Sequence, residues 1–99
     1  MLILIRGAGD LASGVALRLH RAGLRVAMTD LEKPTAIRRT VCFSQAILFG
    51  SAEVEDVTAV RAATLEDVRA ALEKGQIPVL ADPAADCRHW LRPDVLVDA

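Results

Sequence analysis

The sequence predicts an α/β fold in which strands and helices alternate along one chain. Short aliphatic runs such as Leu2-Ile3-Leu4-Ile5 recur between longer stretches whose apolar residues have helical spacing. Hydrophobic residues make up 53% of the chain and aromatic residues only 3%, which suits strands buried on both faces. A glycine-rich turn at 7–14 joins the first run to the first helical stretch. These features predict a Rossmann-like doubly wound parallel sheet of about five strands with helices on both faces.

The first third of the chain predicts a strand, a helix and a second strand. The strand covers 2–6 and stops at a glycine, the helix covers 10–22, and the second strand covers 25–29. Gly23 is a suitable residue for ending the helix. The apolar face that we expect on this helix comprises Leu11, Ala12, Val15, Ala16, Leu19 and Ala22.

The middle third is less regular. Pro34 suits the first turn of a helix because its missing N–H is not needed there, and the apolar spacing extends that helix to about Leu48. Gly50-Ser51 would end it. Residues 52–63 alternate only weakly, and we expect one strand near 57–62.

The last third has clearer boundaries. Thr64 is a good N-cap residue, and Asp67 stands where a capping box places its acid. That helix closes at Lys74-Gly75, and a buried strand follows at 77–81, with Pro78 near its start. A short helix from 83 to about 90 and a last strand at 94–98 complete the predicted order.

The length of 99 residues corresponds to one domain, 1–99, which we expect to bind a nucleotide. The chain stops directly after its fifth predicted strand, so we expect a fragment of a longer protein. Neither a membrane span nor a secretory signal is predicted. Two cysteines without a Cys-x-x-Cys pair favour a reducing, cytoplasmic location. An exposed last strand would favour a homo-oligomer through edge pairing or face packing.

The charge is unevenly distributed. Residues 1–50 hold seven Lys and Arg against three Asp and Glu, whereas residues 51–99 hold five against ten. The basic half contains the glycine turn, which favours an anionic ligand there. No basic stripe with interleaved aromatic residues is present in the sequence, so we do not expect nucleic acid as a partner.

The glycine turn is the main candidate site. Gly7, Ala8, Gly9, Asp10, Leu11 and Ala12 fit the pattern G-x-G-x-x-G/A of dinucleotide-binding domains. The first glycine permits a tight turn, the second lets the backbone approach a pyrophosphate, and the small third residue lets helix and strand pack closely. Ser13-Gly14 extends the turn beyond the usual pattern, and Ser13 is included in the candidate site. The alternative is a tight strand-to-helix turn without a ligand.

Three further residues complete the predicted site. Asp30 ends the second strand, 21 residues after Gly9, where an acid can accept hydrogen bonds from ribose hydroxyls. An acid there would repel a 2′-phosphate and therefore favours NAD-like over NADP-like ligands. Arg38 and Arg39 would pair with an anion at the same sheet edge, or lie on a solvated helix face.

Several other residues are candidate reactive or ligand-binding groups. Cys42 and Cys87 are small core residues, nucleophiles or metal ligands, and the cations Arg88 and His89 beside Cys87 would lower its pKa. Asp82 and Asp98 follow predicted strands, where they either contact a ligand or cap a turn. The sequence predicts no metal site.

Four segments carry a resemblance to a known family: 6–19, Met28-Thr29-Asp30, the stretch AIRRTVCFS at 36–44, and 95–99. They resemble the N-terminal part of the bacterial selenium-dependent molybdenum hydroxylase accessory proteins, which is similar to the xanthine dehydrogenase accessory factors. The resemblance implies a Rossmann-like domain that assists molybdenum cofactor maturation, with NAD or a molybdopterin dinucleotide as its ligand. A molybdenum hydroxylase would then be the partner.

Three functions remain open from the sequence. The first is the accessory protein, which binds a nucleotide-containing small molecule at the Gly7–Ser13 loop. The second is an NAD-dependent oxidoreductase or redox-sensing domain whose catalytic half lies elsewhere. The third is a non-catalytic interaction scaffold. The sequence does not decide whether the chain is an enzyme.

Overall fold

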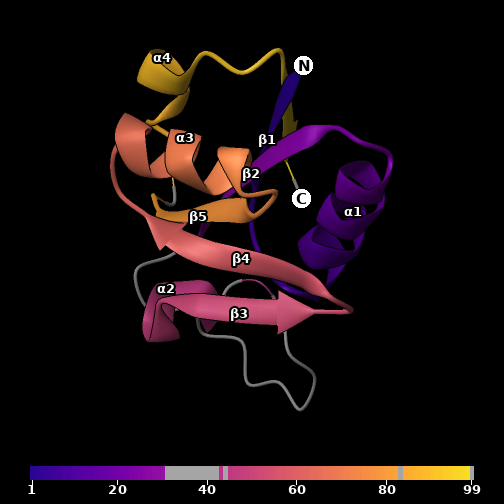
Figure 1. Ribbon diagram of the computed structural model, residues 1–99. Coiled ribbons are helices and arrows are strands. Elements are labelled where there is room, and N and C mark those ends of the chain that lie inside the picture. Colours follow the sequence, from indigo (N-terminus) through magenta and orange to yellow (C-terminus); the bar gives the residue numbers. More distant parts are fainter. Residues whose placement is uncertain (31–42, 44, 83, 99) are drawn as a thin grey trace.

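The computed structural model describes residues 1–30, 43, 45–82 and 84–98. It is a compact α/β arrangement of six strands in one mixed sheet, with helices around it (Figure 1). The strands are β1 (Leu2–Arg6), β2 (Arg25–Asp30), β3 (Ser51–Val54), β4 (Val57–Ala62), β5 (Ile77–Ala81) and β6 (Val95–Asp98). The helices are α1 (Asp10–Arg21), α2 (Gln45–Phe49), α3 (Leu65–Glu73) and α4 (Arg88–Leu91).

The strand order across the sheet is β3-β4-β5-β2-β1-β6. All neighbouring strands run parallel except β3 and β4, whose arrows point in opposite directions in Figure 1. The carboxyl ends of the five parallel strands therefore meet at one edge of the sheet. The five strands end at this carboxyl edge with Arg6, Asp30, Ala62, Ala81 and Asp98.

The five predicted strands are present and run parallel to one another, but the described residues also form a sixth strand, β3, which is antiparallel and makes the sheet mixed. The missed strand forms a hairpin with β4 through Glu55 and Asp56, which have φ of 47° and 73°. Two-residue hairpin turns with positive φ at both positions usually contain Asn or Gly, so the sequence Glu55-Asp56 does not predict a turn. Arg21 supports the turn, because its Nη2 donates to the Glu55 carbonyl at 2.9 Å.

The predicted helix at 34–48 falls largely outside the described residues. The described part is α2, which starts at Gln45 and ends where the Gly50 N–H donates to the Ala46 carbonyl at 2.8 Å. The capping box of α3 is confirmed: Thr64 Oγ1 accepts from the Asp67 N–H, and the Asp67 carboxylate accepts from the Thr64 N–H.

The core consists of two hydrophobic clusters, one on each face of the sheet. Alternate strand residues enter opposite clusters, as Leu4 and Ile5 do, and both of these side chains are fully buried. Helices α1 and α2 pack in the cluster that contains Ile5. Helices α3 and α4 contribute Val68 and Leu91 to the cluster that contains Leu4. Helices therefore cover both faces.

The buried face of α1 matches the prediction in part. The predicted Ala12 and Ala16 are buried, together with Leu17, and Val15 and Leu19 pack against the same cluster, whereas Leu11 is 77% exposed and Ala22 is exposed. Leu11 lies off this face although it is in the first turn with Ala12, because successive residues of a helix point about 100° apart. At the other end of the sheet order, β6 is an edge strand on which Val95 and Leu96 are 41% and 47% exposed. No helix in the described part of the chain is long and apolar enough to span a bilayer.

Candidate functional site

The glycine loop begins directly after β1 with a residue that needs to be glycine. Gly7 has a φ of 118°, which is costly for any residue with a Cβ. Its N–H donates to the Thr29 carbonyl of β2 at 2.6 Å. This bond continues the β1–β2 pairing by one residue. The positive φ of Gly7 then turns the chain sharply at the carboxyl edge.

Gly9, the second glycine, has no such backbone requirement. It is the N-cap of α1 with a φ of −75°, which L-residues adopt readily. A Cβ built on Gly9 would meet no heavy atom within 4 Å. Since glycine has no side chain to cap the helix, the first N–H groups of α1 receive no cap from this position. The loop thus presents backbone donors and open space at the positive end of a helix.

The Ser13 side chain holds the loop in place through two hydrogen bonds. Its hydroxyl donates to the Ala8 carbonyl at 3.1 Å and accepts from the Phe43 N–H at 3.0 Å. Ser13 is 4% exposed and Ala8 is fully buried. The hydroxyl therefore links the loop to Phe43 rather than facing solvent.

Ala12 places the start of α1 against the sheet. It is 3% exposed and belongs to the hydrophobic cluster that contains Ile3 and Ile5 of β1. A larger side chain there would push the helix away from the strand. The small residue at the end of the G-x-G-x-x-A pattern thus has a packing role in this chain.

Asp30 is the last residue of β2 and is half-buried at the carboxyl edge. Its carbonyl accepts from the Asp82 N–H at 2.9 Å, which links the ends of β2 and β5. The Asp10 backbone begins α1, but its side chain lies outside the described part of the chain, as do Arg38, Arg39 and Cys42. The structure therefore brings Gly7, Gly9 and Asp30 to one edge and leaves the two arginines untested.

The segment after β5 is held by Asp82. Its carboxylate accepts from the Asp86 N–H at 3.0 Å and from the Cys87 N–H at 2.7 Å. Burial raises the pKa of Asp82, but the hydrogen bonds from Cys87 and Asp86 and the charge of Arg88 lower it to a net value below 3.8. Asp82 thus caps the turn that leads into α4.

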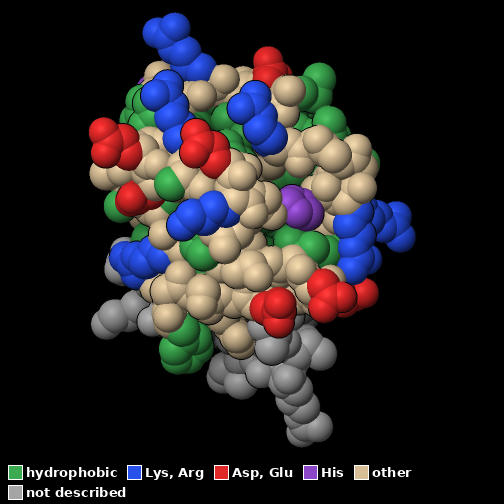
Figure 2. Space-filling view, viewed as in Figure 1, with side chains coloured by type: hydrophobic (Ala, Val, Ile, Leu, Met, Phe, Trp, Pro, Cys, Tyr) green, Lys and Arg blue, Asp and Glu red, His purple; other side chains and the backbone are tan. Residues whose placement is uncertain are grey.

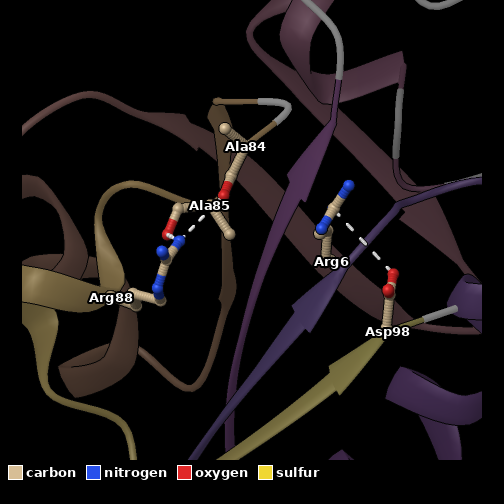
Figure 3. A network of polar contacts seen from close by, with 5 residues as sticks. All are labelled: Arg6, Ala84, Ala85, Arg88 and Asp98. Carbon is tan, nitrogen blue, oxygen red and sulfur yellow. Dashed lines mark hydrogen bonds and ion pairs between the residues drawn. The ribbon is translucent and has the colours of Figure 1, made fainter.

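Cys87 is not a reactive thiol. It is 2% exposed and belongs to the cluster of α3 and α4. Burial and the hydrogen bond to Asp82 raise its pKa to about 12, so the thiol is protonated at neutral pH. The neighbouring Arg88 uses its Nη1 to donate hydrogen bonds to the Ala84 and Ala85 carbonyls (Figure 3).

A hollow of about 380 Å³ opens at the carboxyl edge beyond the ends of β4 and β5. Arg61, Asp82, Asp86, Cys87 and Trp90 line it together with the backbone of the two strand ends. Its volume falls within the range of small-molecule sites. The edge therefore has space for part of a ligand some distance from the glycine loop.

Arg6 and Thr29 also lie at the carboxyl edge and are not among the site residues that the sequence predicts. The Arg6 Nε lies 3.9 Å from Asp98 Oδ1, and the two side chains point toward each other from the ends of β1 and β6 (Figure 3). Thr29 is fully buried and its hydroxyl has no hydrogen-bond partner. Such orphaned hydroxyls are rare, and this one directly precedes Asp30. The sequence feature that could have indicated both residues is a basic or polar side chain at the end of an otherwise apolar strand.

The described residues do not form a metal site. No three His, Cys, Asp or Glu side chains within them come close enough together to hold an ion. The groups that this edge offers to a ligand are backbone N–H donors, carboxylates and guanidinium groups.

Comparison with known proteins gives one relative and no assigned activity. Over 98 residues, or 99% of its length, the chain is 51% identical to the "Uncharacterized protein YqeB" of Escherichia coli strain K12. The chain spans 18% of the length of that relative. No protein-family model matches the chain. No solved structure matches it either.

Proposed function

We propose that this chain is a Rossmann-like, doubly wound domain that binds a nucleotide-containing ligand at the Gly7–Ser13 loop. The parallel strands that converge on one edge and the helices on both faces support this assignment. The ligand pyrophosphate would lie against the N–H groups at the start of α1. The ligand would be NAD or a molybdopterin dinucleotide.

The observation that carries the proposal is the contrast between the two glycines. The fold explains Gly7, whose φ is 118°. It does not explain Gly9, which has an ordinary φ and free space around its missing side chain. An N-cap position favours Ser, Asn or Asp over glycine because their side chains cap the helix. A glycine that leaves the helix uncapped is expected where a ligand phosphate supplies the cap.

The other loop residues would act in support. Ser13 would hold the loop through the Ala8 carbonyl, so that the backbone donors are fixed before the ligand arrives. Asp30 would accept hydrogen bonds from the ribose hydroxyls, which favours NAD over NADP. Arg38 and Arg39 would pair with the charges of the ligand.

The wider role that we propose is that of a cytoplasmic accessory protein in molybdenum hydroxylase maturation. It rests on the resemblance of 6–19, 28–30, 36–44 and 95–99 to the selenium-dependent molybdenum hydroxylase accessory proteins. The domain would hold a dinucleotide form of the cofactor, and a molybdenum hydroxylase would be its partner. An NAD-dependent oxidoreductase or redox-sensing domain is the second candidate, and Asp30 at the end of β2 favours it.

Isothermal titration calorimetry with NAD, NADP, ADP and molybdopterin cytosine dinucleotide tests the proposal. Tighter binding of the pterin dinucleotide supports the accessory role, whereas NAD preference that is lost in Asp30→Ala supports the oxidoreductase. In Gly9→Asn the new side chain caps α1 and occupies the same donors. We therefore expect an unchanged or higher Tm together with binding at least about tenfold weaker.

Gly14→Ala is the matched control, because Gly14 also has no heavy atom within 4 Å of a built Cβ but lies inside α1. It should bind as the parent chain does and be slightly more stable. If Gly9→Asn binds the ligands as tightly as the parent chain, the loop is not the site. If none of the four ligands binds to the parent chain, the scaffold function replaces the proposal.

A further inference from the structure

Three arginines from separate segments lie at the amino edge of the sheet, opposite the glycine loop. Arg25 begins β2, Arg69 lies on α3, and Arg92 follows α4. All three line one groove between α3 and α4, with a volume of about 360 Å³. We call it the arginine groove. Figure 2 shows Lys and Arg side chains, hydrophobic side chains between them and some acidic ones over the part of the molecule where α3 and α4 lie.

The inner surface of the groove is apolar. The two helices and the start of β1 contribute Leu2, Leu65, Val68, Leu72, Trp90 and Leu91. Residues 65, 68, 69 and 72 follow one another at helical spacing, so one stripe of α3 forms a wall. Trp90 is 42% exposed. A second hollow of about 400 Å³, lined by Arg25, Arg69, Leu72 and Glu73, continues the groove along α3.

The three guanidinium groups have no carboxylate partner among the described residues. The ion pairs found there are Arg6 with Asp98 and Arg21 with Glu55. Asp94 also lines the groove, but its Oδ2 accepts from the Leu2 N–H at 2.7 Å. Glu73 lies one helical turn after Arg69 without coming within 4.0 Å of a cationic group. The groove therefore keeps a net positive charge.

Arg92 holds an unfavourable backbone conformation at this site. It is the C-cap residue of α4 with φ 51° and ψ 61°, a left-handed conformation in which glycine is the usual residue. The arginine costs stability there that a glycine would not. Strain of this kind is typical of positions retained for function.

We propose that the arginine groove binds an acidic amphipathic helix of a partner protein. The apolar surface between two helices suits the hydrophobic face of a third helix, and the three arginines match acidic residues along the edges of that face. A single small anion would use the guanidinium groups but leave the apolar surface uncovered. A flat anionic membrane would not enter a groove. The proposal does not depend on the loop function, because the two sites lie at opposite edges.

Trp90 is the one tryptophan of the chain and lines both the arginine groove and the hollow at the carboxyl edge, so its fluorescence detects binding and the variants below locate it. The probe is a 15-residue helical peptide with leucines at i, i+3 and i+7 and glutamates on both flanks. A second peptide carries glutamine in place of every glutamate. We expect a saturable change in Trp90 emission with the glutamate peptide and binding at least about tenfold weaker for the glutamine peptide.

Variants of the full chain then locate the binding. Arg69→Glu and Arg92→Glu should each lower the affinity for the glutamate peptide by about tenfold or more. The double variant should instead bind a peptide that carries lysine in place of every glutamate. Arg18→Glu changes the charge equally on the exposed side of α1 and should leave binding unchanged. Circular dichroism confirms that each variant is folded.

Three results would overturn the proposal. One is the absence of a saturable change up to 1 mM peptide. The second is equal binding of the glutamate and glutamine peptides. The third is binding of phosphatidylglycerol vesicles that the glutamate peptide does not displace, which would assign the surface to a membrane. None of these results affects the calorimetric test of the loop.

Discussion

Two residues at opposite edges of the sheet, Gly7 and Arg92, adopt positive φ at different steric cost. At the carboxyl edge, the φ of 118° falls on Gly7, which adopts it without steric cost. At the amino edge, the φ of 51° falls on Arg92, which does not. The first edge offers backbone N–H groups to a ligand, and the second offers long cationic side chains.

This difference shows what each proposed site requires of its residues. A site made of backbone donors needs residues without side chains. Glycine therefore suits both the tight turn and the binding surface. A site made of guanidinium groups needs the side chain even where the backbone would prefer glycine. Strain is therefore absent at the residue that shapes the loop and present at one that lines the arginine groove.

The largest expected effect tests whether the carboxyl edge also supplies a reactive side chain. With a pKa raised from 9.0 to about 12, Cys87 has about a thousandfold less thiolate at pH 8 than an ordinary thiol. In a chain carrying Cys42→Ser, alkylation by iodoacetamide at pH 8 should be slower than that of a free cysteine peptide by about this factor. Mass spectrometry measures the rate.

The same reaction in 6 M guanidinium chloride is the control, since unfolding removes the burial that raises the pKa of Cys87. The two rates should then agree. Native alkylation as fast as that of the peptide would mean that the carboxyl edge holds an activated thiol, and the redox-sensing alternative would gain support.

Gly7→Ala comes next and separates the two glycines of the loop. A Cβ at a φ of 118° should destabilise the chain by about 2 kcal/mol. Gly9→Ala should change the free energy of unfolding by about 0.5 kcal/mol or less, because its φ of −75° suits alanine and its surroundings are open. Urea denaturation followed by circular dichroism measures both. Equal losses would contradict the different roles assigned to the two glycines.

The contrast between the edges also explains what the sequence could predict. The loop could be predicted because its residues are consecutive and glycine spacing is readable: Gly7, Gly9 and Ala12 stand between a strand and a helix. The arginine groove could not, because Arg25, Arg69 and Arg92 come together only through the strand order. Cys87 was predicted as a core residue or an activated thiol, and its burial together with the contact with Asp82 shows that its pKa is raised.

The fold was predictable where local signals agree with burial. The α3 capping box and the apolar runs of β1 and β5 were located correctly. The β3–β4 hairpin was missed because Glu55 and Asp56 carry its positive φ values without a glycine. The face of α1 was predicted correctly at Ala12 and Ala16 and wrongly at Leu11, since the apolar spacing of the sequence also fits a face shifted around the helix.

Arg92→Gly should have an effect of opposite sign to Gly7→Ala. Glycine relieves the left-handed backbone conformation, so we expect a gain of about 1 kcal/mol in the free energy of unfolding. The same change removes one of the three cations of the arginine groove, and the glutamate peptide should bind more weakly. Urea denaturation and Trp90 fluorescence on the same sample measure the two effects. A loss of stability would show that the Arg92 side chain packs favourably enough to outweigh the strain.

The smallest effect concerns acid stability at the carboxyl edge. Because the folded-state pKa of Asp82 lies below 3.8, its carboxylate contributes stability that is fully present above the pKa of the unfolded chain. This contribution is lost as the pH falls through the folded-state pKa. Asp82→Asn should therefore be less stable than the parent at pH 5, by less than about 1 kcal/mol since the carboxylate is partly exposed.

The difference between Asp82→Asn and the parent chain should narrow between pH 5 and pH 3, as measured by urea denaturation at each pH. The other carboxylates titrate alike in both chains, so their contributions cancel in the comparison. Asp67→Asn, in the exposed capping box of α3, provides the reference for a carboxylate that accepts backbone hydrogen bonds away from the site. A pH-independent difference for Asp82→Asn would mean that the turn before α4 needs only an acceptor there and not a charge.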